Sequence, residues 1–275
     1  MSTVYKTSTD ELHAWIRAEV ELAGRPAEGS SGAAVRRVQE WLNLHDRGVV
    51  VDGDFGTATK QAVQDFQEAR SLPETGAVDP ETWKDLVRPM TEVLVKRLDS
   101  SYPDFALAII EYAKAHLASH PREVGDRNRG PWVRLYMRGN QGNDWAWCAG
   151  FVTFLMTQAA DSMEVPPPIE GSCRCDDLAK QAIDAGLFVE EEDADWERLH
   201  KGNVFLIQRA PGDWNHTGVV LRAGPTAFTT VEGNTNDTGG HEGYEVCRRT
   251  RSYTSTDFIK MCKEQHIPTE HGGDN

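Results

Sequence analysis

Residues 51–66 read VDGDFGTATKQAVQDF, and this stretch decides the fold of the first part of the chain. The Asp52-Gly53 dipeptide favours a tight turn, and Thr57 stands where the N-cap of a following helix is expected. Apolar residues then recur at helical spacing to the end of the stretch. The stretch therefore predicts a turn that opens into an amphipathic helix.

The same turn-to-helix pattern recurs weakly in residues 75–87, TGAVDPETWKDLV. There Asp79 provides the N-cap and Pro80 occupies the first helical position. Upstream, residues 33–44 (AAVRRVQEWLNL) carry their apolar side chains on one helical face. A segment of about 60 residues with these elements is expected to form a compact helical bundle.

This part of the chain resembles the peptidoglycan-binding three-helix domain that is appended to bacterial and phage wall hydrolases. The resemblance covers residues 33–87. The signature positions are Gln39, Leu42, Asp52-Gly53, Phe55-Gly56, Thr59, Ala62-Val63, Phe66-Gln67, Gly76, Val78, Thr82-Trp83 and Leu86. Most of them are packing and turn residues, so they support the fold more than binding. In this family the DGxFG turn lies near the glycan–peptide groove, so the resemblance implies Asp52, Gly53 and Phe55 as substrate-binding candidates.

The sequence around this domain predicts five parts. A helix is expected within residues 8–23, and RPAEGSSG (25–32) has the composition of a linker. The role of residues 1–24 stays open between packing on the binding domain, tethering to a delivery partner and folding alone. The expected parts are an N-terminal helix and linker (1–28), the peptidoglycan-binding domain (29–90), a linker helix (91–103), a second domain (104–265) and a polar tail (266–275).

The second domain changes its hydrophobic period along its length. Helical spacing predicts the linker helix at 91–98 and, within this domain, helices at 104–118, 148–159 and 175–187, the last one capped by Ser172 or Asp176. Short β-rich runs with Gly, Pro or Asn between them follow at 203–208, 216–223, 227–234 and 244–251. Helices followed by antiparallel strands predict an α+β fold.

Composition limits the function classes. The net charge of −14 argues against a nucleic-acid partner, because binding to phosphates needs an excess of Lys and Arg. No window approaches 18 uninterrupted apolar residues, so no membrane span is expected. The N-terminus lacks the basic start and apolar run of a secretory signal. We therefore expect a protein made in the cytoplasm that reaches the cell wall only after release or delivery.

Five cysteines (148, 173, 175, 247 and 262) form no even framework, so a disulfide scaffold is not expected. Cys173 and Cys175 form a CxC pair, which is a weak zinc signal without a second pair. Cys148 lies in DWAWCAGFV (144–152) between aromatic residues and an apolar run. A core residue, half of a disulfide, a metal ligand and a nucleophile are the alternatives for it.

A cysteine nucleophile needs a lowered pKa, a neighbouring imidazole and a polar group that orients that imidazole. Cys148 begins a predicted helix, whose positive end favours a thiolate. His216 in GDWNHTGVVL begins an apolar strand, and the next strand ends in TVEGN. Glu232 and Asn234 alternate with Gly233, so both point to one face of that strand. Either can orient His216 in a triad.

This order of residues resembles the CHAP family of cysteine amidase/peptidase domains, which have a papain-like fold. The resemblance covers residues 104–262 and rests on NRGPWVRLYM, WCAGFV, GSC (171–173), NHTGVV and VEGNTN (231–236). It implies Cys148 as the nucleophile, His216 as the general base and acid, and Glu232 or Asn234 as the orienting group. It also implies an oxyanion hole formed by the backbone near Cys148.

The chain departs from the CHAP pattern at KGNVFLI, where Asn203 replaces the usual Asp, at a position that we interpret as structural. Cys173 matches the family's GSC and is expected to pack or cap. Trp147 and Trp214, which lie close to the catalytic pair in sequence, are the expected substrate contacts. The chemistry requires no metal and no cofactor.

The sequence thus predicts a monomeric peptidoglycan hydrolase with Cys–His catalysis, first an N-acetylmuramoyl-L-alanine amidase. A stem-peptide or cross-link endopeptidase with the same catalytic residues is the alternative. A catalytically inactive wall-binding adaptor is the alternative of another class. The biological setting stays open between a phage endolysin and an interbacterial toxin, which would be paired with an immunity protein and a delivery apparatus.

Overall fold

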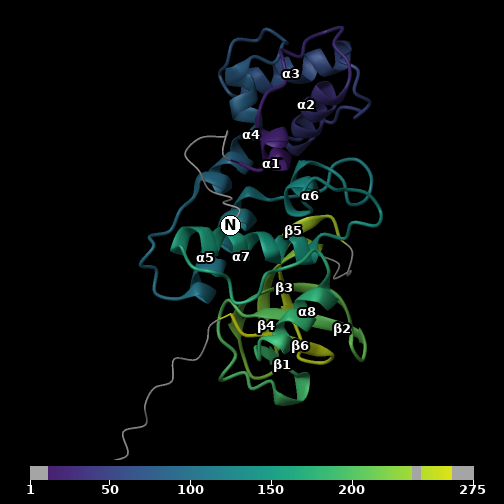
Figure 1. Ribbon diagram of the computed structural model, residues 1–275. Helices are drawn as coiled ribbons and strands as arrows, with labels where there is room; N and C mark the ends of the chain where they lie inside the picture. The colour runs from purple at the N-terminus through teal and green to yellow at the C-terminus, as the bar shows by residue number, and fades with distance from the viewer. Residues whose placement is uncertain (1–11, 237–242, 262–275) are drawn as a thin grey trace, which may run out of the picture.

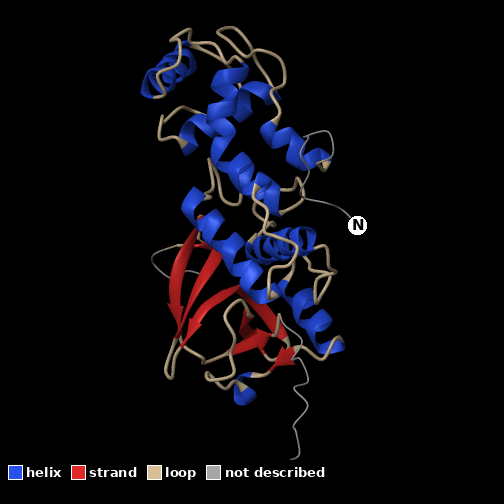
Figure 2. Cartoon of the chain, turned by 90° about the vertical axis from the view of Figure 1, so that its left-hand side faces the viewer, coloured by secondary structure: helices blue, strands red, loops and turns tan. Residues whose placement is uncertain are grey.

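The computed structural model describes residues 12–236 and 243–261. Within these ranges the chain forms eight α-helices and a six-stranded antiparallel sheet, with the helices first in sequence (Figure 1). The predicted α+β class is confirmed. The molecule is elongated, with a purely helical N-terminal lobe at one end and the sheet at the other (Figure 2). No helix in the described ranges is long and apolar enough to cross a membrane.

Three helices build the N-terminal lobe: α2 (Ala33–Leu44), α3 (Thr57–Ala69) and α4 (Pro80–Val95). Their apolar faces meet in a core that includes Trp41, Phe55 and Phe66. The expected Asp79 cap is present, because its side chain accepts a hydrogen bond from the Thr82 N–H. Thr57 is not the N-cap of α3. Gly56 holds that position and makes no side-chain cap.

Helix α4 differs from expectation at its C-terminal end. The separate helix predicted at 91–98 is instead the last part of α4, which continues through Pro89 to Val95. Met90, Val93 and Leu94 are all buried and extend the apolar face of the helix past the proline. Packing of this face therefore maintains one long helix across the expected boundary between residues 90 and 91.

Helix α1 (Ala14–Val20) joins the two lobes, because it packs against α4 on one side and α6 on the other (Figure 1). The buried Arg134 guanidinium of α6 pairs with Glu19 of α1 at 2.7 Å and with Glu40 of α2 at 2.6 Å. Three roles were open for residues 1–24. Residues 14–20 have a packing role, because they lie between the two lobes.

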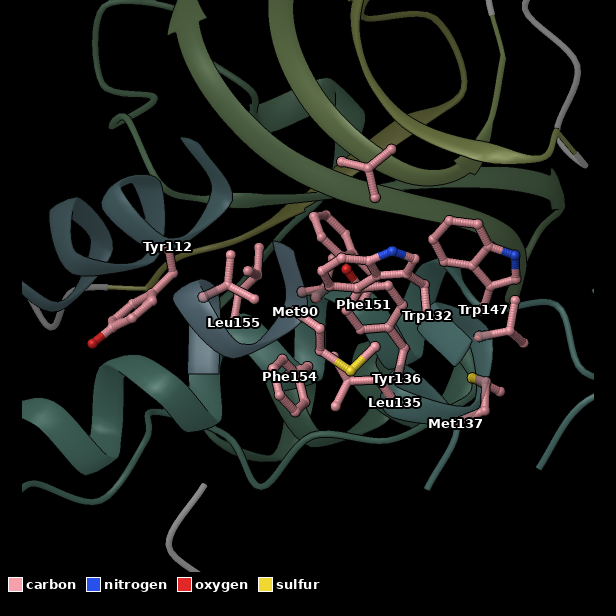
Figure 3. Packing of buried hydrophobic residues seen from close by; sticks show 14 of the residues in the cluster. Met90, Tyr112, Trp132, Leu135, Tyr136, Met137, Trp147, Phe151, Phe154 and Leu155 are labelled. Atoms are coloured by element: carbon pink, nitrogen blue, oxygen red, sulfur yellow. The ribbon is translucent and has the colours of Figure 1, made fainter. Parts of the chain in front are cut away.

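The second lobe begins with four helices: α5 (Phe105–Ser119), α6 (Pro131–Tyr136), α7 (Cys148–Met163) and α8 (Cys175–Asp184). Helix α7 is buried on nearly every side and lies in an aromatic cluster that includes Trp132, Tyr136 and Phe151 (Figure 3). A Cβ at Gly150 would lie 2.7 Å from the Tyr136 carbonyl oxygen. Glycine at that position therefore permits the close approach of α7 to α6.

The sheet has the strand order β1-β6-β2-β3-β4-β5, with every neighbouring pair antiparallel. Its strands are β1 (Phe188–Val189), β2 (Val204–Ala210), β3 (Asp213–Ala223), β4 (Phe228–Thr235), β5 (Glu245–Arg251) and β6 (Thr256–Ile259). The four longer strands match the predicted runs, whereas the short β1 and β6 were not predicted. Helix α7 packs on the central strands β3 and β4. This packing brings the start of α7 to the middle of the sheet.

Candidate active site

Three elements bring the predicted catalytic residues together. Cys148 is the first residue of α7, His216 lies on β3, and Glu232 lies on the neighbouring strand β4. The side chains of His216 and Glu232 are fully buried, and Cys148 is 3% exposed. The ring nitrogen Nε2 of His216 lies 2.8 Å from Oε2 of Glu232. His216 also interacts with the thiol of Cys148.

The Glu232 carboxylate is held from three sides. Besides His216, Arg251 of β5 donates from Nε to Oε1 at 2.9 Å and from Nη2 to Oε2 at 2.6 Å. The Thr230 hydroxyl donates to Oε1 at 2.6 Å. A Cβ at Gly218 would lie 2.8 Å from Cγ of Glu232, so the glycine of the HTGVV run provides the space for this side chain. The carboxylate is therefore fixed in position and paired.

The environment of these groups shifts their pKa values in the direction that a nucleophile needs. Burial alone would lower the pKa of His216, but hydrogen bonds and charge interactions with Cys148 and Glu232 raise it to about 9. Burial alone would raise the pKa of Glu232, but the Arg251 guanidinium and then His216 lower it to about 2. These shifts favour the charged forms of His216 and of Glu232, whose carboxylate is paired with the Arg251 guanidinium.

Cys175 is a further member of the site. Its Sγ lies 3.8 Å from Sγ of Cys148, and it is the first residue of α8. A hydrogen bond from the Cys175 thiol and, after it, the interaction with His216 hold the pKa of Cys148 well below its ordinary value. The pKa of Cys175 is raised, first by its hydrogen bond with Cys148 and then by burial. The shifts thus favour the thiolate form at Cys148 and the thiol form at Cys175.

Asn234 does not contact His216 but fixes the loop before α7. It lies in a bulge of β4 with a φ of 56°, in the left-handed region. Its Oδ1 accepts from the backbone N–H of Trp147 at 3.1 Å. Its Nδ2 donates to Asn128 Oδ1 at 3.1 Å and to the Gly243 carbonyl at 2.7 Å. Of the two alternatives for the orienting residue, the structure thus places Glu232 at the imidazole and Asn234 beside the start of α7.

The two tryptophans predicted as substrate contacts lie in different environments. Trp147 is fully buried, stacks on Tyr136 and donates from its indole N–H to Glu123 at 2.8 Å. A fully buried indole offers no surface to a ligand, so Trp147 supports the start of α7 instead. Trp214 is half-buried and borders a cleft of 410 Å³. Its indole N–H donates a hydrogen bond to Oδ2 of Asp257 at 2.7 Å.

The binding-domain candidates lie in one turn. Asp52 is exposed, and its Oδ1 accepts hydrogen bonds from Gln39 and from the Asp54 N–H. Gly53 is buried with a φ of 85°, which requires glycine, and its N–H donates to Gln39. Phe55 is a core residue at 2% exposure. Of the three, only Asp52 offers its side chain to a ligand, while Gly53 and Phe55 build the turn.

Among the described residues, no group of three or more His, Cys, Asp or Glu side chains is arranged to hold a metal ion. Asn203 is buried, and its side-chain oxygen accepts from the Met261 N–H at 3.2 Å. This contact fits the structural interpretation of the departure at KGNVFLI.

Sequence reasoning missed Cys175, Arg251 and Glu123 as members of the site. Cys175 carried one usable signal, because it begins a predicted helix just as Cys148 does. Arg251 ends a predicted strand among several charged residues, and nothing local marks it as a partner of Glu232. Glu123 lies in a polar loop, and only the tertiary fold brings it to Trp147.

Comparisons with known proteins identify the N-terminal lobe. The family described as "Putative peptidoglycan binding domain" matches residues 31–86. The zinc D-Ala-D-Ala carboxypeptidase of Streptomyces albus G is 40% identical over 67 residues, which are 23% of this chain and 26% of that protein. The chain thus spans about a quarter of the length of this curated relative. The matched stretch of 67 residues is shorter than the segment that runs from Cys148 to His216. The match therefore cannot include both of these residues.

Two solved structures are also similar. The SleB N-terminal domain is 33% identical, covering 24% of this chain and 90% of that domain, with a TM-score of 0.23. A fused Zn-dependent amidase/peptidase/peptidoglycan-binding domain-containing protein from Clostridium acetobutylicum ATCC 824 is 23% identical. It covers 38% of this chain and 46% of that protein, with a TM-score of 0.21. TM-scores this low carry no argument about the whole fold. The family match shows that residues 31–86 form a domain of the peptidoglycan-binding family, and Cys148, His216 and Glu232 lie outside it.

Proposed function

We propose that this chain is a peptidoglycan hydrolase that cleaves an amide bond with Cys148 as nucleophile. The observation that carries the proposal is the buried alignment of a thiol at a helix start, an imidazole and an arginine-held carboxylate. A neighbouring histidine activates a cysteine by taking its proton, and a carboxylate that accepts a hydrogen bond from the imidazole orients the histidine. The peptidoglycan-binding domain at residues 31–86 supports the choice of polymer. The resemblance of residues 104–262 to CHAP domains agrees with both.

The groups of the site give each step of the reaction a donor or acceptor. The Cys148 thiolate attacks the carbonyl carbon of the amide, and backbone N–H groups at the start of α7 stabilise the oxyanion. His216 as imidazolium protonates the leaving amine, which leaves a thioester on Cys148. Neutral His216 then takes a proton from water, which hydrolyses the thioester and releases the acid. Glu232 holds the ring in place and stabilises its charged form throughout.

The binding domain raises the concentration of the catalytic site at the polymer. A module that stays on the wall turns each further encounter with substrate into an intramolecular event. The packing of α1 between the lobes and the buried Arg134 pairs hold the two domains in a fixed relation. Cleavage is therefore expected close to the point of attachment.

The first candidate for the bond is N-acetylmuramoyl-L-alanine, and a peptide bond of the stem or cross-link is the second. We place the protein at the wall as a phage endolysin or an interbacterial toxin. The surrounding genes distinguish these settings, because holin and tail genes accompany an endolysin and an immunity gene accompanies a toxin.

The test is mass spectrometry of muropeptides after digestion of purified Gram-negative sacculi. Wild type is compared with Cys148→Ala, and Cys173→Ala is the matched control because Cys173 is a second cysteine of the same domain with no role in the proposed reaction. Free stem peptides that begin at L-alanine, seen with wild type and Cys173→Ala only, are expected for an amidase. Shortened stems or split cross-links would keep the mechanism and make the chain an endopeptidase.

Two other outcomes would overturn the proposal. Equal product release by Cys148→Ala would exclude cysteine catalysis. Sedimentation of both proteins with sacculi, without any released product, would favour the wall-binding adaptor instead.

A further inference from the structure

The starting observation is the contact between two thiols at the starts of two helices. Cys148 and Cys175 are the first residues of α7 and α8, and their sulfur atoms lie 3.8 Å apart. The CHAP-like alignment of Cys148, His216 and Glu232 makes no use of a second thiol. Cys175 is 7% exposed and therefore belongs to the interior of the site.

The backbone around these two residues is tied together. Thr153 of α7 donates its hydroxyl to the Ser172 carbonyl at 2.7 Å and accepts from the Ser172 N–H at 2.9 Å. In the first turn of α8, Asp176 accepts from the Trp214 N–H of β3 at 2.9 Å. These hydrogen bonds hold the start of α8 against both α7 and β3. The proximity of the thiols is thus built into the fold and does not depend on a mobile side chain.

The two thiols differ in their readiness to react. The pKa of Cys148 lies well below its ordinary value and that of Cys175 well above it. A thiolate attacks a disulfide, and a second thiol beside it resolves the mixed product. The two sulfur atoms of a disulfide lie about 2.05 Å apart. The sulfur atoms of Cys148 and Cys175, now 3.8 Å apart, must therefore move closer by only about half of that distance.

We propose that Cys148 and Cys175 form a redox-modification site, in which a small disulfide such as oxidised glutathione joins them in a reversible internal disulfide. The Cys148 thiolate attacks one sulfur of the glutathione disulfide and expels one glutathione thiolate. Cys175 loses its proton to solvent, attacks the Cys148 sulfur and expels the second glutathione. Two protein thiols are oxidised to one disulfide, and one glutathione disulfide is reduced to two thiols.

The consequence, which rests on the proposed function, is a reversible block of hydrolysis. A sulfur in a disulfide carries no thiolate charge and is therefore not nucleophilic enough to attack an amide. Oxidised chain is therefore inactive, and any thiol reductant that reaches the site restores the nucleophile.

The test uses the full chain, reduced and then incubated with oxidised glutathione without any wall substrate. Wild type is expected to lose two of its five thiols and the mass of two hydrogens. Proteolysis without reduction is expected to yield a linked pair of peptides that contain Cys148 and Cys175. Dithiothreitol should reverse the change and restore muropeptide release.

Variants separate this site from other thiol chemistry. Cys175→Ser should keep a stable glutathione adduct on Cys148, because the resolving thiol is gone. Cys173→Ala should form the internal link as wild type does, although it lies two residues from Cys175. A stable adduct on wild type, or a link to any other cysteine, would overturn the inference.

The inference and the proposed function fail in different ways. A chain that forms the internal link and never cleaves sacculi when reduced refutes the proposed function and leaves the redox site standing. A reduced chain that cleaves sacculi and never forms the link refutes the redox site alone.

Discussion

His216 and Glu232 form a buried pair, with Nε2 of the imidazole 2.8 Å from Oε2 of the carboxylate. Neither side chain has any exposed surface. Arg251 binds both oxygens of the same carboxylate, so the carboxylate stays charged. Removing a partner from such a pair leaves an uncompensated buried charge, which makes each member testable by a single substitution.

Glu232→Gln should lower kcat by about 10²–10⁴-fold, because it removes the charge that holds and stabilises the imidazolium. The pKa of His216, raised to about 9 in part by Glu232, should fall. The alkaline limb of the pH–rate profile should therefore move to lower pH. The measurement is muropeptide release against pH, with both limbs assigned to the Cys–His pair as a unit.

Glu245→Gln is the matched control for this variant. Glu245 also accepts a hydrogen bond from a histidine, the exposed His120, at 2.6 Å, but it lies outside the site. Its variant should keep the wild-type profile. An unchanged profile for Glu232→Gln would remove Glu232 from the orienting role.

Arg251→Gln should change the pH–rate profile in the opposite direction. The Glu232 carboxylate loses its guanidinium partner, so its negative charge acts more strongly on His216 and the alkaline limb should move to higher pH. Lost charged hydrogen bonds should also lower the free energy of unfolding by about 2 kcal/mol. Arg248→Gln, at an exposed position of the same strand, is the control. A shift to lower pH would contradict this account.

Asn234→Ala should lower kcat without moving either limb of the profile, because Asn234 contacts the Trp147 backbone and not His216. The lost hydrogen bonds of its buried amide should cost about 1–3 kcal/mol of stability. Asn234→Gly tolerates the left-handed φ of 56° and isolates the loss of the amide. Wild-type kcat in the glycine variant would mean that the backbone conformation alone matters. A shifted alkaline limb would return Asn234 to the orienting role.

The sequence predicted the elements of this site better than their contacts. Helix and strand positions follow from local spacing, and Cys148, His216 and Glu232 each stand at an element whose type the pattern indicates. Of the caps expected for α3, α4 and α8, only Asp79 forms its side-chain hydrogen bond. The sequence could not show whether Asn234 or Glu232 orients His216, because strand alternation places both side chains on one face. Only the bulge in β4 directs them to different partners. Arg134 lies in a helix that was not predicted, and its partners Glu19 and Glu40 are far away in sequence. Such pairs depend on how the lobes pack.

Arg134→Met should destabilise the protein by about 3–5 kcal/mol, because it leaves the buried Glu40 without its cation and leaves Glu19 with Arg37 at 3.4 Å in place of Arg134 at 2.7 Å. Urea unfolding monitored by tryptophan fluorescence measures the change. Arg129→Met, at an exposed position, is the control and should stay close to wild type. The triple variant with Glu19→Gln and Glu40→Gln should recover most of the loss, because no charge is then left buried. Equal stability of Arg134→Met and wild type would contradict the role of Arg134 at the junction of the lobes.

His116 should make the protein less stable as the pH falls from about neutral. It is fully buried on α5, where its Nε2–H donates to Gln158 Oε1 and its Nδ1 accepts from the Tyr136 hydroxyl, both at 2.8 Å. Burial lowers its pKa from 6.5 to about 4. The unfolded chain binds this proton more readily, so the stabilisation is present above pH 6.5 and is lost as the pH falls to about 4.

This one group should therefore account for about 3 kcal/mol of the loss of stability over that range. His116→Gln carries no titrating group and should be less stable than wild type at neutral pH, because its shorter side chain cannot keep both hydrogen bonds. Its stability should depend less steeply on pH between the two values. Urea unfolding of both proteins at several pH values gives the two slopes. Equal slopes would show that other groups cause the acid sensitivity.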